Sequence, residues 1–311
     1  MPQNSACPLC GGSAFSFCTI AGSGYLRCGA CTLVFLDPLP DPGELKSLYR
    51  GAYAKLLGIP ARREEELFLK MGPKPEEGAS LLDIGSSGGH FLLEAQRRGF
   101  AAEGVELREE GRGASPPLPV FYGPFEEYPP GRTFSFITML HTLEHFPDPV
   151  AMVSKAKSLL SPGGSLLITV PNFGSAAAGV LGKYWEWFQP PFHLFHFNAR
   201  TMALLLEKCG LEICEISSRR SFSLSLATQL SFYLPIVLLK MSGIYYRART
   251  RVTGGSGRGK APLVALLQAY LKGADVLMAP MDLLLTPLSR HLEKSLKGEE
   301  LVIVARHCSG K

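Results

Sequence analysis

The sequence LLDIGSSGGHF, at residues 81–91, constrains the fold of this chain more than any other stretch. An apolar run ends in the acid Asp83, a turn of small residues follows, and an apolar segment starts at Phe91. A strand, a glycine-rich turn and a helix in this order bring backbone N–H groups close to a bound ligand. On its own, the stretch predicts the first unit of an α/β sheet that could serve any nucleotide.

Strand and helix patterns alternate along the chain from this stretch onward. The runs of apolar residues are short enough for strands, and glycine and proline mark the ends of the segments between them. Such alternation is typical of an α/β fold. The predicted strands are 80–84, 101–107, 119–122, 133–140, 165–172, 211–218 and 300–307, and the predicted helices are 89–98, 150–160, which ends at SPGG (161–164), and 201–209.

Four of the eight cysteines form two C-x-x-C pairs, Cys7 with Cys10 and Cys28 with Cys31. Their spacing, with glycines beside the thiols, is typical of zinc knuckles. Four thiolates fill a tetrahedral Zn²⁺ shell, so we expect a structural zinc site that folds a short ribbon. Reduced cysteines without a metal are one alternative, and a redox pair is another.

The composition is that of a globular protein with a sizeable core, since 46% of the 311 residues are hydrophobic and 19% are charged. A formal net charge of +5 suits an anionic membrane surface or a phosphorylated substrate. This charge is too small to indicate nucleic-acid binding by itself, and we expect no nucleic-acid partner. The N-terminal sequence has no apolar signal segment, so we expect a cytoplasmic protein.

A second acidic residue follows the glycine turn at a sequence spacing that is typical of nucleotide-binding folds. Asp83, Gly85 and Gly89 follow the pattern D/E-x-G-x-G-x-G, with Ser87 at the position of the middle glycine. Glu106 lies at the tip of the next predicted strand, about 20 residues past the turn. An acid at this position can hydrogen-bond the two ribose hydroxyls of a nucleotide.

Three further motifs follow in order: HTLEHFPDP at 141–149, SPGG at 161–164 and VPN at 170–172. With the glycine turn and the second acid, they resemble class I S-adenosylmethionine (SAM) methyltransferases. The resemblance is to the subfamily of ubiquinone-type and methyltransferase-23-like enzymes, many of which carry a C-x-x-C ribbon before the core. It covers about residues 1–218 and the last ten or so residues.

The resemblance implies a fold and a domain organisation. The fold would be a doubly wound, Rossmann-like sheet of seven strands in the order 3-2-1-4-5-7-6, with strand 7 antiparallel. The implied domains are a zinc ribbon over 1–40, a methyltransferase core over 41–218 plus 299–311, and an apolar helical insertion over 219–298 between strands 6 and 7.

The resemblance also implies a SAM site at the carboxyl ends of strands 1 and 4. Asp83 would help to fix the ammonium group of the methionine half, Glu106 would hold the ribose, and His141 would lie beside the methionine portion. Two residues depart from the family pattern: Pro124, in the loop that would face the adenine, and Ser135, in strand 4. The implied cofactor set is Asp83, Gly85, Ser86, Ser87, Gly89, Glu106, Leu107, Gly123, Leu140 and His141.

Two rival functions remain beside a SAM-dependent methyltransferase. An NAD-dependent dehydrogenase would need G-x-G-x-x-G, whereas this turn has an acid two residues before its first glycine. The departures at Pro124 and Ser135 keep a second rival open, a non-catalytic methyltransferase-like binding protein whose SAM site has decayed.

Histidines are the candidate catalytic residues. The resemblance implies in-line transfer of a methyl group from the sulfonium to an O, N or C nucleophile, which needs positioning and sometimes a general base. His193, in the segment PPFHLFHF at 190–197, is the predicted base, and His196 and His141 are further candidates. A histidine that only holds this loop in place is the alternative hypothesis.

A second cluster could hold a divalent metal. If the segment after strand 4 is helical, His141, Glu144 and His145 share one face. The resemblance is to E-x-x-E-H, which binds a metal in ubiquinone-type O-methyltransferases. Anchoring of the loop after strand 4 is the simpler hypothesis for these residues.

The insertion over 219–298 has an apolar character. Residues 221–239 carry no charge, and residues 262–288 show a helical periodicity of apolar residues. The alternatives are a transmembrane helix, a peripheral contact of 221–288 with the inner face of the membrane, or helices packed as a lid or a homodimer surface. A lid or a membrane contact would suit a small-molecule, sugar or lipid-linked acceptor.

Overall fold

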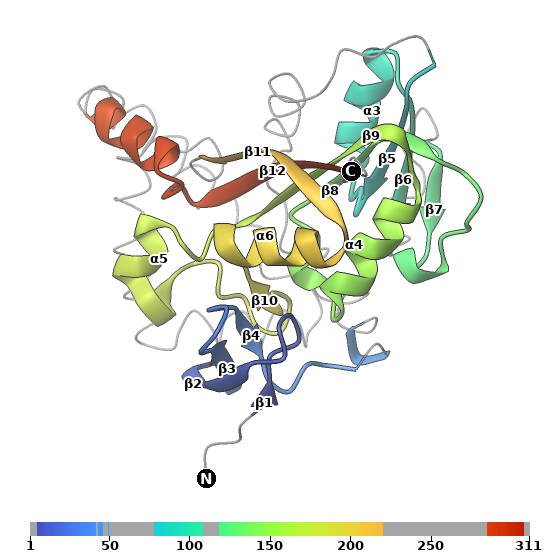
Figure 1. The fold of residues 1–311 in the computed structure, drawn as a ribbon. Coiled ribbons are helices and arrows are strands. Elements are labelled where there is room, and N and C mark those ends of the chain that lie inside the picture. The colour runs from blue at the N-terminus through green and yellow to red at the C-terminus, as the bar shows by residue number, and fades with distance from the viewer. Residues whose placement is uncertain are drawn as a thin grey trace, which may run out of the picture.

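Two β-sheets organise the protein, one of seven strands and one of five. The computed structural model describes residues 5–41, 43–45, 49, 78–107, 118–219 and 285–307. Most of the predicted insertion, including residues 220–284, lies outside the described residues. A helix over 285–294 leads from it into the last strand (Figure 1).

The large sheet has the strand order β11-β12-β9-β8-β5-β6-β7. Its strands are β5 (Ser80–Ile84), β6 (Ala101–Glu106), β7 (Val120–Tyr122), β8 (Phe134–Leu140), β9 (Leu160–Pro171), β11 (Leu211–Arg219) and β12 (Glu300–His307). Only β12 runs antiparallel to its neighbours, β11 and β9. Numbered along the chain, the order is 3-2-1-4-5-7-6 with an antiparallel seventh strand, so the predicted fold class is confirmed.

Helices cover both faces of this sheet, which explains the almost continuous apolar runs of its central strands. Leu81 and Phe136 pack on the side of α3 (His90–Arg97). Their neighbours Leu82 and Ile137 belong to the core on the other side, with α4 (Pro149–Ser158) and α6 (Ala199–Lys208). Figure 1 shows α4 and α6 between the sheet and the blue N-terminal strands.

The small sheet holds β1 (Ser5–Ala6), β2 (Ser13–Ile20), β3 (Ser23–Cys28), β4 (Val34–Leu36) and β10 (Phe195–His196), all antiparallel. The first four strands form the predicted ribbon. The fifth, β10, comes from the loop after β9 of the large sheet and pairs with β4. The sequence did not predict this strand, which ties the ribbon to the candidate catalytic loop.

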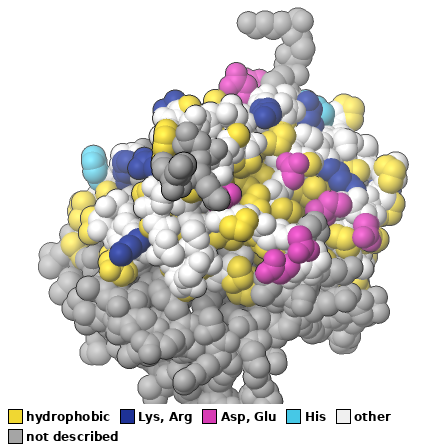
Figure 2. All heavy atoms as spheres, turned by 90° about the horizontal axis from the view of Figure 1, so that it is seen from below, with side chains coloured by type: hydrophobic (Ala, Val, Ile, Leu, Met, Phe, Trp, Pro, Cys, Tyr) yellow, Lys and Arg dark blue, Asp and Glu magenta, His cyan; other side chains and the backbone are white. Residues whose placement is uncertain are grey.

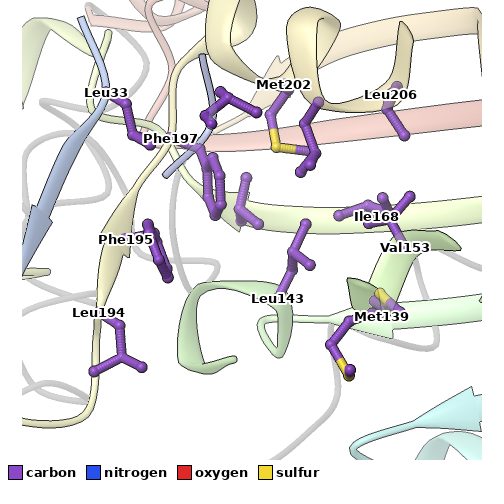
Figure 3. Close-up of a cluster of buried hydrophobic side chains, with 14 of the residues drawn as sticks. Leu33, Met139, Leu143, Val153, Ile168, Leu194, Phe195, Phe197, Met202 and Leu206 are labelled. Atoms are coloured by element: carbon purple, nitrogen blue, oxygen red, sulfur yellow. The ribbon is translucent and has the colours of Figure 1, made fainter. Parts of the chain in front are cut away.

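One hydrophobic core joins the ribbon to the large sheet. Leu33 of the ribbon, Ile168 of β9 and Met202 of α6 belong to the same buried cluster. Figure 3 shows these side chains together with Phe197, which follows β10. The predicted domain boundary near residue 40 therefore divides the chain but does not divide the core.

The SPGG turn departs from the prediction. It was expected to lie between a helix and a strand, but α4 ends at Ser158 and β9 already begins at Leu160. The pairing of β9 with β8 shifts register between Phe134 and Phe136, which accommodates the extra residues. The described part of the chain contains no helix with the length and hydrophobicity needed to cross a bilayer.

Candidate functional site

The glycine turn between β5 and α3 has the backbone conformation that its sequence suggests. Gly85, Ser87 and Gly89 have positive φ values of 84°, 48° and 77°. The amides of Gly85 and Ser86 donate hydrogen bonds of 2.8 and 3.0 Å to the carbonyl of Val105 on β6. A Cβ atom on Gly85 would lie 2.7 Å from Thr142 Cγ2, so only glycine fits there.

Two buried acids flank this turn on neighbouring strands. Asp83 is 3% exposed and accepts a 2.6 Å hydrogen bond from the hydroxyl of Thr138 on β8. Glu106 is 7% exposed and accepts a 2.7 Å hydrogen bond from the amide of Ser87. Both acids lie toward the carboxyl edge of parallel strands, where open α/β sheets bind their ligands. The turn and the acids are thus held as one unit.

The remaining residues of the predicted cofactor set lie at the same edge. Leu107 follows β6, Leu140 ends β8, and Gly123 follows β7 and donates a 3.0 Å hydrogen bond to the carbonyl of Glu106. Ser86 Oγ is buried and has no hydrogen-bond partner in the described part of the structure. This hydroxyl faces Gly104 of β6, where any side chain would collide with it.

His141 follows β8 with an unusual backbone, at a φ of 49°. Its amide donates to the carbonyl and the hydroxyl of Thr169 at 3.0 and 3.1 Å. Its ring lies 5.2 Å from that of Trp187, nearly parallel at 7°. Two acids face the ring nitrogens, with Nδ1 3.5 Å from Glu144 Oε1 and Nε2 3.5 Å from Glu300 Oε1.

These carboxylates decide the charge of His141. Burial by itself lowers the pKa of the imidazole, but Glu300 and Glu144 outweigh burial and raise the pKa to about 10. Glu300 also receives a 2.7 Å hydrogen bond from Arg219 Nε on β11. His141 is therefore a cation at neutral pH, and a cation is a poor general base.

The metal hypothesis for His141, Glu144 and His145 required an α-helix over these residues, and the structure has none there. Residues Leu143–His145 form a 3-10 helix, η3, and the left-handed His141 precedes it. A different trio converges instead. One potential ligand atom each from Glu144, His145 and His193 lies within 4.8 Å of the others.

Neighbouring groups fix the chemistry of this trio. His145 Nδ1 lies 2.9 Å from the carbonyl of Phe192 and 2.7 Å from the hydroxyl of Tyr49. The carbonyl can only accept, so it favours a proton on Nδ1, whereas the hydroxyl can donate or accept. Burial lowers the pKa of His145, which favours the neutral ring. With the proton on Nδ1, Nε2 would carry a lone pair that it could donate to a metal. Both carboxylate oxygens of Glu144 are buried without a hydrogen bond among the described residues.

The two histidines of the 190–197 segment occupy different surroundings. His193 is 3% exposed, and its ring lies 4.7 Å from that of His145 and 5.8 Å from that of Trp187. His196 is 1% exposed, lies on β10 and packs 4.2 Å from the ring of Phe188. Only His193 thus joins the cluster around Glu144. The catalytic roles of both remain predictions.

The four ribbon cysteines converge on one point. Sγ of Cys7 lies 3.6 Å from Sγ of Cys31, and Sγ of Cys10 lies 3.5 Å from Sγ of Cys28. These distances are too long for disulfides, whose S–S bond is about 2.05 Å. They match the edges of about 3.8 Å expected for four sulfurs placed about 2.3 Å from a zinc ion.

The backbone around the cysteines has the form of two matched knuckles. The amide after each turn donates back to the first cysteine, from Gly11 to the carbonyl of Cys7 at 2.9 Å and from Thr32 to that of Cys28 at 3.1 Å. Burial raises the pKa values of the Cys7 and Cys31 thiols, whereas the amides of Cys31 and Ala30 outweigh burial at Cys28 and lower its pKa to about 7. It is therefore the positions of the four sulfurs that indicate a metal site. The residues present fit a Zn²⁺ ion held by thiolates.

A comparison with protein families decides the class of the chain. The family described as "Methyltransferase domain" matches residues 58–216, just over half of the chain. The chain belongs to this methyltransferase family.

Curated relatives of this chain include two proteins named "Ubiquinone biosynthesis O-methyltransferase". The one from Paramagnetospirillum magneticum is 31% identical over 99 residues, which cover 29% of this chain and 40% of the relative. The one from Xanthomonas euvesicatoria is 27% identical over 157 residues, which cover 45% of this chain and 65% of the relative. The chain thus spans less than two thirds of the length of either relative.

Solved structures are similar to this chain at low identity. The [4+2]-cyclase SpnF shares 17% identity at a TM-score of 0.47, covering 86% of this chain and 92% of its own. A SAM-dependent methyltransferase from Archaeoglobus fulgidus shares 16% at a TM-score of 0.47, covering 78% and 93%. Both scores are low, so the fold assignment rests on the strand order and the family.

The two departures from the methyltransferase pattern have different consequences. Ser135 lies at the beginning of β8, where its amide donates a 3.2 Å hydrogen bond to Ser80 Oγ at the beginning of β5. This is the edge opposite the glycine turn, so the serine does not bear on the cofactor cradle. Pro124 precedes the 3-10 helix η2 (Phe125–Glu127), directly after Gly123, and remains beside the predicted adenine loop.

Sequence reasoning missed two residues of this site, Thr138 and Glu300. Thr138 holds Asp83 because the two are direct partners in the pairing of β5 with β8. Glu300 reaches His141 from the last strand, and Trp187 stacks on the same ring. A polar residue inside an apolar strand was a usable signal for Thr138, whereas the contacts of Glu300 depend on the full sheet order.

Proposed function

We propose that this protein is a SAM-dependent methyltransferase. The observation that carries the proposal is the glycine turn locked to two buried acids, Asp83 and Glu106, at the carboxyl edge of the sheet. Membership of the methyltransferase-domain family supports the same assignment. The names of the curated relatives also support it, although they cover only part of those proteins.

The residues of the turn would divide the work of holding SAM. Asp83 would fix the ammonium group, because a buried carboxylate favours a cationic partner. Glu106 would accept hydrogen bonds from the ribose hydroxyls, and Gly123 would let the adenine approach the backbone. When bound, SAM supplies a methyl group that is already activated on a sulfonium. The protein then has to position the acceptor and manage its proton.

His193 is the residue we propose as general base. It is a buried histidine beside the neutral His145 and the indole of Trp187, whereas His141 is held as a cation by two acids. Its acceptor would be a small molecule, a sugar or a lipid-linked compound. The relatives are named O-methyltransferases, so a hydroxyl acceptor is the first class to test.

A second role for His193 is favoured by the trio with Glu144 and His145. Glu144 is fully buried, and its carboxylate faces the charged His141 at 3.5 Å but makes no hydrogen bond among the described residues, so it has room for a divalent cation as a second partner. A carboxylate with two imidazoles is a known ligand set for such ions, and it leaves positions for an acceptor oxygen. In this version His193 would bind the metal, and the metal would lower the pKa of the acceptor hydroxyl.

The four cysteines would hold a structural Zn²⁺, because their thiolates complete a tetrahedral shell.

We also propose that this protein does not bind a nucleic acid. Figure 2 shows basic and acidic side chains mixed with hydrophobic ones on the described part of one face, rather than a continuous basic stripe. A homodimer surface or a peripheral membrane contact through 221–288 stays a prediction, since that stretch lies almost entirely outside the described residues.

The test is SAM turnover with two acceptor panels, one of catechols and other phenols and one of nucleotide-linked sugars. S-adenosylhomocysteine formation should depend on an acceptor. His193→Gln should lower kcat by about 10²–10⁴-fold if the histidine is the base. The matched control is His291→Gln, which changes an exposed histidine of the 285–294 helix.

The two roles of His193 separate in a metal assay. If His193 binds a metal, added Mg²⁺ or Mn²⁺ should stimulate the wild type, and His193→Gln should abolish the calorimetric signal for that ion. If it is the base, turnover should ignore these ions. Cofactor binding without turnover on either panel would favour the non-catalytic alternative.

A further inference from the structure

The ribbon and the His193 loop are joined through their backbones. Strand β10 pairs with β4, with Phe195 opposite Phe35 and His196 opposite Val34. One residue further along, the amide of Leu36 donates a 2.8 Å hydrogen bond to the carbonyl of Leu194. The segment that carries His193 therefore continues into an edge strand of the ribbon sheet.

Tyr25, on the ribbon strand β3, contacts the same loop through both its hydroxyl and its ring. Its hydroxyl donates a 3.4 Å hydrogen bond to the carbonyl of His193. Its ring, only 1% exposed, lies 5.1 Å from that of Phe188 and 5.3 Å from that of His196. The loop rests on the ribbon with both its backbone and its aromatic side chains.

The cysteine knuckles also reach α6, which follows the loop. Thr32, in a left-handed conformation next to Cys31, accepts a 3.1 Å hydrogen bond from Asn198 Nδ2 at the start of α6. The carbonyl of Ala30, in the same knuckle, accepts one of 3.1 Å from Arg200. The second knuckle thus holds the chain just after His196. A change in the geometry of the four cysteines has a direct path to both ends of β10.

The cofactor turn takes its support from elsewhere. Its hydrogen bonds run to Val105 and Glu106 of β6, and those of Asp83 run to Thr138 of β8. These strands belong to the large sheet, and none of them pairs with a strand of the ribbon sheet.

We propose that metal binding by Cys7, Cys10, Cys28 and Cys31 positions the His193 loop, so that the ribbon controls the acceptor side of the site and leaves the cofactor turn in place. Tyr25 is then a positioning residue that acts through the His193 carbonyl. The catalytic consequence rests on the proposed function, but the structural coupling does not.

Tryptophan fluorescence can report on the coupling between the cysteines and the His193 loop. Its two tryptophans, Trp185 and Trp187, both lie in the segment before His193 and are 0% and 4% exposed. The full-length protein would be stripped of zinc with a chelator and reloaded with zinc alone. Three readouts are measured in each state: tryptophan emission, hydrogen exchange by mass spectrometry and calorimetric binding of S-adenosylhomocysteine.

Zinc removal should shift the tryptophan emission to longer wavelength and speed exchange in peptides covering 185–198. Peptides covering 80–92 should keep their protection, and S-adenosylhomocysteine should bind within about threefold of the loaded affinity. Zinc alone should reverse the changes. Cys10→Ser should reproduce them, and Cys214→Ser, at an exposed cysteine of β11, should not.

Tyr25→Phe separates positioning from folding, because it keeps the ring and all four thiols. It should retain zinc, speed exchange around His193 and change kcat more than the acceptor KM. Confirmed zinc loss without a change over 185–198 would overturn the proposal. So would loss of protection over the whole large sheet, because the coupling would then be global. Normal exchange in Tyr25→Phe would remove Tyr25 from the path. A loop response in a protein without turnover would uphold the coupling and count against the proposed function.

Discussion

Gly85 is the residue at which a single carbon atom decides whether the cofactor turn can form. Its φ of 84° disfavours any L-residue, and Thr142 occupies the space that a side chain would need. Ser87 adopts a positive φ of 48° in the same turn, a conformation that favours the glycine found at this position in the family pattern. Whether the turn with this serine still binds the cofactor stays a prediction.

Gly85→Ala should therefore abolish measurable S-adenosylhomocysteine binding in calorimetry. The left-handed backbone costs about 1–2 kcal/mol for alanine, and the clash adds displacement of Thr142. Gly131→Ala is the matched control, since its φ is 99° but nothing lies within 4 Å of the added atom. Equal cofactor affinity of the two variants would show that the turn does not touch the cofactor.

The raised pKa of His141 should make the stability of the fold depend on pH. Its pKa is raised from 6.5 to about 10, so the ion pairs with Glu300 and Glu144 stabilise the fold fully below pH 6.5 and are lost as pH rises through 10. Glu300→Gln should lower stability by on the order of 1–3 kcal/mol at pH 6. Thermal unfolding from pH 6 to 10 should show the deficit shrink.

Arg219→Gln is the control for this experiment. It removes the other partner of Glu300 and keeps the carboxylate that faces His141, so the pKa of His141 should stay high in an NMR titration. A deficit of Glu300→Gln that stays constant across the pH range would mean that the Glu300–His141 pair contributes nothing.

At the scale of elements, the sequence predicted the regular structure well and the contacts between distant segments poorly. Periodicity and caps located the helices and strands of the large sheet, such as β5 and α6, because those signals are local. Strand β10 escaped because two residues in an aromatic loop carry no periodicity. Likewise, the 3-10 form of η3 depends on the left-handed His141, which no local pattern announces.

Asn198 joins two elements with one side chain and offers a test at this scale. Its Oδ1 accepts a 3.0 Å hydrogen bond from the amide of Thr201, which caps α6, and its Nδ2 donates to Thr32 of the ribbon. Asn198→Ala should cost about 0.5–2 kcal/mol for the cap alone. In a chain of this size, that lowers Tm by about 2–4 °C per kcal/mol.

Asn198→Asp is the informative partner variant, because it keeps the cap and removes the donor to Thr32. Differential scanning calorimetry should place its Tm between those of the wild type and Asn198→Ala. If Asn198→Asp equals the wild type, the bond to the ribbon adds no stability, and the ribbon is held by its apolar contacts instead.

At the scale of the whole molecule, the ribbon and the methyltransferase sheet form one body around a shared core. The sequence predicted both parts and their chemistry, because cysteine spacing and the glycine turn are local patterns with a known physical purpose. It missed how they meet, since the meeting depends on pairing between residues 34–36 and 194–196, far apart in the chain. The candidate acceptor loop lies where the two parts join, and the cofactor turn lies on the large sheet alone.

The central claim is that the glycine turn and its two acids bind SAM, and calorimetry with S-adenosylhomocysteine tests it most directly. The wild type should bind one equivalent. Glu106→Gln should weaken binding about tenfold or more, the value of a hydrogen bond to a charged group. Glu103→Gln should not, because Glu103 lies on the same strand but pairs with Arg132 and Tyr128. Absence of binding to the wild type at millimolar ligand would contradict the account.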